Sequence, residues 1–188
     1  MLGLVKRPKE ATGLHVALMR GINLAAHNRV PMAELVTLFE KAKCEGVRTY
    51  IASGNVVFRA TDSVAEGIAA TIAAAVAKKF KISVPVVTRT AEELHDALAS
   101  NPFPRADESE LGIAFLADAP SKKQIASLDP DRSPPDEFRV IGREVYLRLP
   151  NGFAKTKLTN AWFDKQLATV STMRNWRTLQ KLVEMTAA

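Results

Sequence analysis

The sequence predicts an α+β fold in which helices cover one face of mainly antiparallel sheets. Two observations lead to this prediction. Short apolar runs alternate along the 188 residues with segments of helical periodicity, and glycine-containing pairs interrupt the strand-like runs as they do in hairpins. A hydrophobic content of 47% is enough for a full core, which excludes a chain that is disordered throughout. The length suits one larger domain or two small, closely joined halves.

The first half begins with a strand, a loop and a helix. Residues 15–19 are a continuous apolar run, which is typical of a buried strand, and a loop follows over residues 21–30. Pro31 opens a helix, because proline lacks only an N–H that the first helical turn leaves unbonded. Leucine, leucine, phenylalanine and alanine then recur on one helical stripe until Glu45 and Gly46 stop the helix.

The rest of the first half predicts a long strand or hairpin, a helix and a strand. Residues 47–60 are the most strand-like part of the chain, and Gly54-Asn55 within them either turns a hairpin or marks a bulge. An alanine-rich helix follows over residues 64–80, capped by Asp62 or Ser63. Residues 82–88 predict a strand that Pro85 restricts to the edge of a sheet or to a bulge.

The second half predicts two helices around a strand and then a hairpin. Thr90 and Glu93 form a capping box for a helix that runs through Leu98. A strand over residues 111–117 is followed by a weak helix that Pro120 or Ser121 opens.

The chain then predicts a hairpin and two final helices. Residues 137–141 and 144–149 flank Gly142-Arg143 as the two strands of a hairpin. Thr159 caps a helix that carries Trp162, and Ser171 or Thr172 caps a last helix that carries Trp176. The two halves therefore have similar orders of elements, and no repeat of individual residues is evident between them.

The cellular setting follows from composition. A single cysteine, Cys44, excludes an internal disulfide and predicts a cytoplasmic location. Residues 1–11 lack the apolar block of a secretory signal, and no apolar run has the ~18 residues that a membrane span needs. We therefore expect no membrane partner, and the sequence leaves the oligomeric state open.

The positive charge of the chain is concentrated near its end. Residues 1–138 hold equal numbers of basic and acidic side chains, so the last fifty residues carry the whole net charge of +6. Such a concentration favours an anionic partner, either a phosphorylated small molecule or a nucleic acid. The alternative is a basic surface that only maintains solubility.

Four segments resemble one known bacterial family, the domain-of-unknown-function 1697 family. They are Leu-Met-Arg-Gly-Ile-Asn at 18–23, Tyr-Ile-Ala-Ser-Gly-Asn-Val-Val-Phe at 50–58, the loop at 149–160, and Arg-Asn-Trp-Arg-Thr at 174–178. The resemblance implies a pair of ferredoxin-like α/β sandwich subdomains packed as one body, for which we expect the bounds 12–90 and 91–188. It implies no activity. Ala25-Ala26 stands where the family usually has a Gly-Gly step, which disfavours close approach of a ligand to that backbone.

These segments also hold the candidate ligand-binding residues. Loops at strand ends often bind ligands, and an anion could be held by Arg and Asn side chains in the first turn of the predicted last helix. Each residue has a structural alternative: Asn in a loop satisfies backbone groups, Arg pairs with a carboxylate or joins the two halves, and a Ser-Gly-Asn step forms a bulge. The candidates are Arg20, Asn23, Ser53, Asn55, Lys157, Arg174 and Asn175.

No metal or cofactor site is predicted. The histidines at 15, 27 and 95 are scattered, none at a metal-ligand spacing from an acidic residue or Cys44. A glycine-rich phosphate loop and the RNA-recognition aromatic signature are also missing.

Three functions therefore stay open from sequence. The first is binding of an anion in a cleft between the halves. The second is a metal-independent enzyme, with His27 as a possible base. The third is a structural or interaction protein in which the four segments only make the contacts that hold the two halves together.

Overall fold

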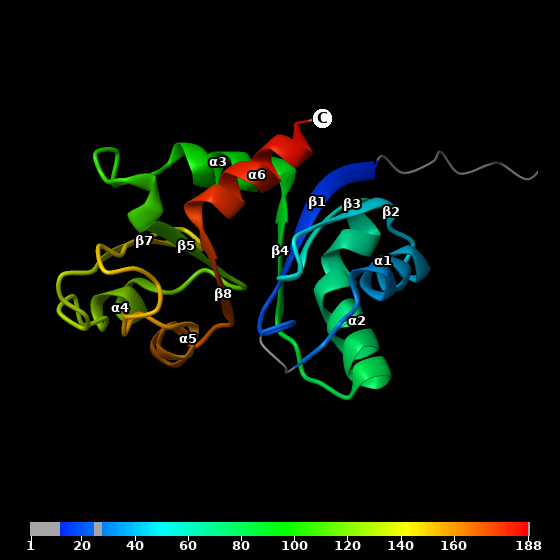
Figure 1. Ribbon diagram of the computed structural model, residues 1–188, viewed down its shortest axis with the longest axis horizontal. Helices are drawn as coiled ribbons and strands as arrows, with labels where there is room; N and C mark the ends of the chain where they lie inside the picture. Colours follow the sequence, from blue (N-terminus) through cyan, green and yellow to red (C-terminus); the bar gives the residue numbers. More distant parts are fainter. Residues whose placement is uncertain (1–11, 25–27, 188) are drawn as a thin grey trace, which may run out of the picture.

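The structure is a computed structural model that describes residues 12–24 and 28–187 and contains two four-stranded antiparallel sheets (Figure 1). The loop positions Ala25, Ala26 and His27 lie outside the described residues, and so do the predictions made on them. The first sheet and its helices are β1 (Thr12–Met19), α1 (Met32–Lys41), β2 (Glu45–Tyr50), β3 (Asn55–Thr61), α2 (Asp62–Phe80), β4 (Val86–Thr90) and the following α3 (Ala91–Ala99). The second sheet and its helices are η1 (Glu108–Glu110), β5 (Leu111–Leu116), α4 (Lys122–Ala126), β6 (Glu137–Ile141), β7 (Glu144–Arg148), α5 (Asn160–Leu167), β8 (Ser171–Asn175) and α6 (Trp176–Thr186).

The two sheets have the same topology. Their strand orders are β2-β3-β1-β4 and β6-β7-β5-β8, so each subdomain is a βαββαβ unit with the ferredoxin-like order. A helix, α3 or α6, follows each unit. This confirms the predicted α+β pair, whereas the exact boundary between residues 90 and 91 stays a prediction.

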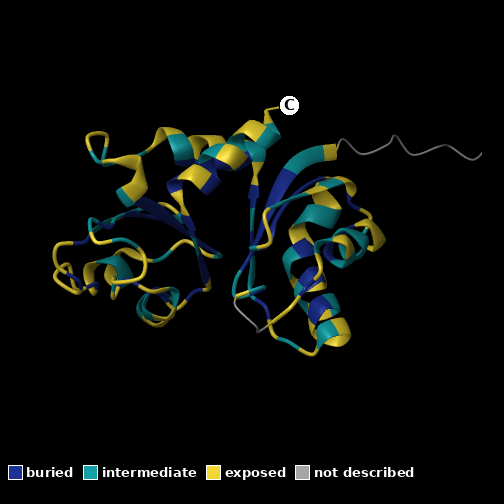
Figure 2. Cartoon of the chain, in the orientation of Figure 1, coloured by how far each residue is buried: buried dark blue, intermediate teal, exposed yellow. Residues whose placement is uncertain are grey.

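Three apolar clusters hold the layers together. Figure 2 shows the buried residues in dark blue along the strands and on parts of the helices. Alternate residues of β1 point to opposite faces: Ala17 and Met19 pack on α1 and α2, whereas Val16 and Leu18 belong to a central cluster. This central cluster joins both sheets to α3 and α6, which lie side by side across the top of the molecule in Figure 1. A third cluster packs α5 on the far face of the second sheet. The central strands of both sheets are therefore covered on both faces.

The two halves also share a short repeat of individual residues, contrary to the expectation from sequence. β4 ends in Arg89 followed by Thr90, and β8 ends in Arg174 followed by Asn175. In each half the second residue caps the next helix by accepting the N–H of the residue three positions later. A buried leucine follows at the same spacing in both helices, Leu94 and Leu179. In both halves, therefore, an arginine is followed by the helix-capping residue, then by three further residues, and then by a leucine.

The prediction for residues 171–175 was wrong. Ser171 and Thr172 do not cap the last helix but begin β8, which pairs with β5 from Leu116↔Ser171 to Gly112↔Asn175. Serine and threonine suit both a helix cap and a strand, and pairing with β5 decides between them. The consequence is that Arg174 lies at the end of a strand and α6 begins one residue after Asn175.

Three further details differ from the sequence prediction or resolve it. The strand predicted over residues 82–88 begins at Val86, because pairing with β1 extends from Met19↔Val86 to His15↔Thr90. The strand is at the sheet edge, as Pro85 indicated. Thr61 occupies the N-cap of α2 and makes no side-chain cap, so neither Asp62 nor Ser63 is the cap. Gly54-Asn55 closes a hairpin rather than a bulge in one strand, because separate strands β2 and β3 end and begin there.

Burial shifts the pKa of two side chains, Cys44 and His15. Cys44 lies in the first apolar cluster, and burial raises the pKa of its thiol to about 11. His15 on β1 stacks on Phe58 at 5.6 Å between ring centroids, and its Nε2 has no hydrogen-bond partner within residues 12–24 and 28–187. Burial lowers the pKa of His15 below its ordinary 6.5, although Asp62 and Glu93 oppose the shift.

We expect the free energy of unfolding to fall as the pH drops below 6.5, the ordinary pKa of a histidine side chain. The lowered pKa of His15 is expected to be one cause of this fall. The unfolded chain takes up the His15 proton at a higher pH than the folded chain, so acid favours unfolding. Urea unfolding at a series of pH values would measure this loss in the wild type and in His15→Phe, which preserves the ring contact. An equal pH dependence in both proteins would contradict the assignment.

Candidate functional site

Arg174 is the centre of the polar contacts between the two subdomains. Its Nε donates to Asn55 Oδ1 at 2.6 Å, and its Nη2 donates to the carbonyls of Met19 at 2.6 Å and Ser53 at 3.3 Å. Its Nη1 donates to Thr172 Oγ1 and to the Met173 carbonyl, both at 2.8 Å. All five guanidinium N–H groups therefore have protein acceptors. The side chain joins β8 to the ends of β1 and β3.

Asn55 is suited to Arg174 because its amide both accepts and donates. Its Oδ1 accepts from Arg174, while its Nδ2 donates to the Tyr50 carbonyl at 3.1 Å and to Ser53 Oγ at 2.9 Å. An aspartate could accept from the guanidinium but could not donate to the carbonyl. Asn55 is fully buried, so each of these bonds replaces a bond to water.

Arg20 and Asn23 also contact protein atoms. Arg20 Nη1 lies 2.7 Å from Asp164 Oδ2 and donates to the Ser171 carbonyl, which links the end of β1 to the second subdomain. Asn23, at a φ of +54°, donates to the carbonyls of Val30 and Ala52 and accepts the Val30 N–H. These contacts match the structural alternatives stated for both residues.

An equivalent arginine, Arg89 of β4, makes the reciprocal contacts. Its Nη2 donates to the carbonyl of Leu116, the last residue of β5, just as Arg174 contacts the last residue of β1. It also donates to the carbonyl of Arg143 in the β6–β7 turn, where Arg174 contacts Ser53 in the β2–β3 turn. Its Nε donates to Glu144, the first residue of β7, at 2.8 Å. The two subdomains are thus joined by a reciprocal pair of arginines.

The two arginines differ in charge compensation. Burial lowers the pKa of Arg174 to about 10, and its side-chain partner Asn55 is neutral. Burial also lowers the pKa of Arg89, but the Glu144 carboxylate opposes this shift. Both side chains stay charged at neutral pH.

The other predicted site residues lie elsewhere or contribute by their backbone. Ser53 offers its carbonyl to Arg174 and its Oγ to Asn55. Lys157 is exposed in the β7–α5 loop, where its backbone N–H donates to Ser133 Oγ at 2.9 Å. Asn175 is exposed and caps α6 by accepting the Thr178 N–H. The structure therefore brings Arg174, Ser53 and Asn55 together and leaves Lys157 in a separate loop.

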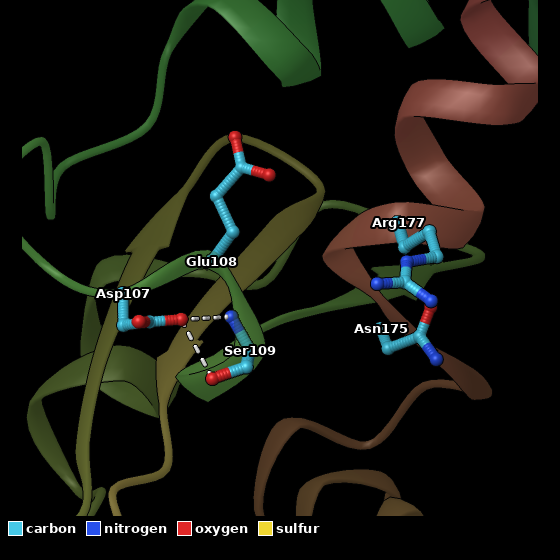
Figure 3. Close-up of a pocket in the computed structure, with 5 residues that line it drawn as sticks. All are labelled: Asp107, Glu108, Ser109, Asn175 and Arg177. Carbon is cyan, nitrogen blue, oxygen red and sulfur yellow. Dashed lines mark hydrogen bonds between the residues drawn. The ribbon is translucent and has the colours of Figure 1, made fainter.

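Asn175 lines a cavity of about 520 Å³ at the start of α6, which we call the α6 cavity (Figure 3). Arg177 and Asn175 form one side, and Asp107, Glu108 and Ser109 face them from the other. No hydrogen bond or ion pair involves the Arg177 side chain among the described residues. The cavity therefore holds a guanidinium that makes no ion pair among the described residues, and two carboxylates face it.

The acidic side of the cavity is held in place by hydrogen bonds. Asp107 Oδ1 accepts both the N–H of Ser109 at 2.8 Å and its hydroxyl at 2.6 Å. These two bonds lower the pKa of Asp107. Glu108 Oε1 accepts from Gln180 of α6 at 2.8 Å. A carboxylate with a lowered pKa is a weak base, so this arrangement suits binding better than proton abstraction from Ser109.

Sequence reasoning missed Arg89 and residues 107–109. The repeated Arg, cap and Leu spacing could have identified Arg89 as the counterpart of Arg174. Residues 107–109 carry no such signal, because they read as a charged surface loop. Among residues 12–24 and 28–187, no group of three His, Cys, Asp or Glu side chains could hold a metal ion. In the same part of the chain, no helix is long and apolar enough to cross a membrane.

Comparisons with known proteins place the chain in a family. The model of the family "Protein of unknown function (DUF1697)" matches residues 14–146, which include the segments at 18–23 and 50–58. The comparison with curated proteins found no match. Among solved structures, the conserved bacterial protein SP0830 from Streptococcus pneumoniae is similar, with a TM-score of 0.73 and 22% identity. The similarity covers 94% of this chain and 99% of that one, and it supports the fold.

Proposed function

The chain belongs to the DUF1697 family of proteins of unknown function, and we propose that it binds a small phosphorylated molecule in the α6 cavity. The observation that carries the proposal is that Arg177 lines the cavity and that its guanidinium has no acceptor in the described part of the chain. A volume of about 520 Å³ lies within the usual range for small-molecule sites. Arginine is suited to this role because its planar fork matches the oxygens of a phosphate group.

The surroundings of Arg177 add donors for the phosphate. Asn175 lines the same cavity, and its amide nitrogen makes no hydrogen bond among the described residues, because only its oxygen caps α6. The first N–H groups of a helix have no partner within it, and the helix dipole favours an anion there. The phosphate is therefore expected to lie between Arg177 and the start of α6.

The opposite side selects for a ligand that also carries hydrogen-bond donors. Asp107 and Glu108 each use one carboxylate oxygen for a protein hydrogen bond, and the second oxygen of each is available. These oxygens can accept from hydroxyl or amino groups. A phosphorylated polyol or amino compound satisfies both sides, whereas bare phosphate meets the carboxylates without compensation.

A nucleic acid fits the structure less well. RNA-binding modules of related architecture stack bases on an exposed sheet face, but here both faces of the central strands are buried. Two carboxylates beside Arg177 also oppose a polyanion. These features favour the small-molecule form of the anion-binding prediction, in a cavity lined by residues of the second subdomain and not in the predicted cleft between the halves.

We expect the Arg177→Gln variant to bind sn-glycerol 3-phosphate at least roughly tenfold more weakly than the wild type, because a charge-assisted hydrogen bond is lost. Isothermal titration calorimetry at low salt measures the affinity. Arg132→Gln is the matched control, because Arg132 is also exposed in the second subdomain but does not line the α6 cavity.

Equal affinity of the wild type and Arg177→Gln, or no binding by the wild type, would overturn the proposal. A single-stranded RNA oligonucleotide serves as the competitor in the same titration. If RNA displaced sn-glycerol 3-phosphate and the affinity for RNA fell steeply with salt, a nucleic-acid partner would be favoured instead.

A further inference from the structure

We propose that a second cavity binds a small aromatic carboxylate. Its volume is about 420 Å³, and it lies on the connector between α3 and β5, which also supplies residues 107–109 to the α6 cavity. None of the residues that line it belongs to the α6 cavity, so this inference does not depend on the proposed function. Its lining residues are Pro102, Phe103, Pro104, Arg105, Ala106, Glu137 and Arg148.

The apolar part of this cavity is the Phe103 ring, which stands on a backbone held by hydrogen bonds between two prolines. Asn101 Oδ1 accepts the Phe103 N–H at 2.9 Å, and the Phe103 carbonyl accepts the Ala106 N–H at 3.1 Å. Pro102 and Pro104 restrict the backbone on both sides of the ring. A half-buried aromatic side chain on a backbone fixed in this way offers a stacking surface to a flat ring.

The polar part offers arginine donors that are already oriented. Arg148 donates through Nε to Glu110 and through Nη1 to Glu137, and its Nη2 has no acceptor among the described residues. Arg105 lines the same cavity, is exposed and makes no ion pair within the described chain. Both guanidinium groups can therefore donate to a ligand carboxylate.

The charges around the cavity limit the ligand to a single negative charge. Arg139 lies over the Phe103 ring at 5.8 Å, so three arginines, at 105, 139 and 148, stand against the two carboxylates of Glu110 and Glu137. One excess positive charge favours a monoanion, and the carboxylates disfavour a ligand with several negative charges. A ligand with an aromatic ring that stacks on Phe103 and one carboxylate that accepts from Arg105 is an aryl carboxylate.

Benzoate is the probe for this site, and the amide chemical shifts of the 15N-labelled protein report where it binds. We expect shifts at the amides of Phe103, Arg105 and Ala106, since Pro104 has no N–H. Binding should be weaker for both benzamide, which lacks the charge, and cyclohexanecarboxylate, which cannot stack. The Phe103→Leu variant keeps apolar volume and should weaken benzoate binding by roughly three- to tenfold, the size of an aromatic stacking contribution. Arg105→Gln, at an exposed position, should weaken it independently of any effect on folding.

Phe153→Leu is the matched control, because Phe153 is also a partly exposed phenylalanine of the second subdomain and does not line this cavity. Benzoate affinity should be unchanged in this variant. The proposal is overturned if benzoate does not bind, if its shifts cluster outside residues 103–106, or if benzamide binds as tightly as benzoate. Because Arg177 lines only the α6 cavity, Arg177→Gln should bind benzoate normally.

Discussion

Replacing Arg174 by methionine is expected to lower the free energy of unfolding by about 3–5 kcal/mol, because several buried acceptors lose their donor at once. Methionine fills much of the same volume but cannot donate, so the carbonyls of Met19 and Ser53 and the Oδ1 of Asn55 lose their donor. A buried acceptor without a partner costs about 1–3 kcal/mol. Urea unfolding monitored by circular dichroism measures the change.

The conservative change Arg174→Lys tests the geometry separately from the charge. Lysine keeps the charge but concentrates its donors at one nitrogen, whereas the acceptors of Arg174 surround a planar fork. We expect it to rescue only part of the stability. Arg20→Met is the control, because the Arg20–Asp164 pair is partly exposed and such pairs contribute about 0–1 kcal/mol. If Arg174→Met cost no more than Arg20→Met, the reciprocal arginines would not be what joins the subdomains.

Trp176→Ala is expected to destabilise the protein by about 3–5 kcal/mol, the usual cost of truncating a buried large aromatic residue. Trp176 is only 4% exposed and belongs to the central cluster that contacts both sheets, α3 and α6. The cavity left by the indole would lie between the subdomains, where packing from two sides limits collapse. Thermal and urea unfolding measure the loss.

Trp162→Ala provides the comparison for this prediction. Trp162 is partly buried and packs at the edge of the third cluster, where it contacts Phe138 and Phe163. A smaller loss is expected there, because less of the ring is removed from water. A loss at Trp162 equal to that at Trp176 would mean that the central cluster is no more important than the peripheral one.

The convergence of distant segments was predictable, but the kind of contact was not. Arg20, Asn55 and Arg174 stood out because polar side chains interrupted apolar runs, and the structure places all three where the subdomains meet. That Arg174 uses all five N–H groups on protein acceptors depends on the ends of β1, β3 and β8 meeting. No local sequence pattern indicates this contact, because Asn55 and Met19 each lie more than a hundred residues from Arg174 in the chain.

The cavities were still less accessible to sequence reasoning. Asp107 and Ser109 look like any polar loop, and Phe103 between prolines looks like the end of a helix. Their importance comes from facing Arg177 across one cavity and from lining another with Arg148. Cavities arise from the relative placement of elements, and periodicity along the chain does not encode that placement.

The sequence by itself determined the α+β class, most helix and strand positions, the capping box of Thr90 and Glu93, and the concentration of positive charge near the end of the chain. These features depend on neighbouring residues, through side-chain periodicity and short-range hydrogen bonds. Only the tertiary structure decided that residues 171–175 form a strand, that Arg89 and Arg174 make reciprocal contacts, and that Asn175 and Arg177 line a cavity. Each of these depends on free energy gained between segments far apart in sequence, where pairing and burial override local preference.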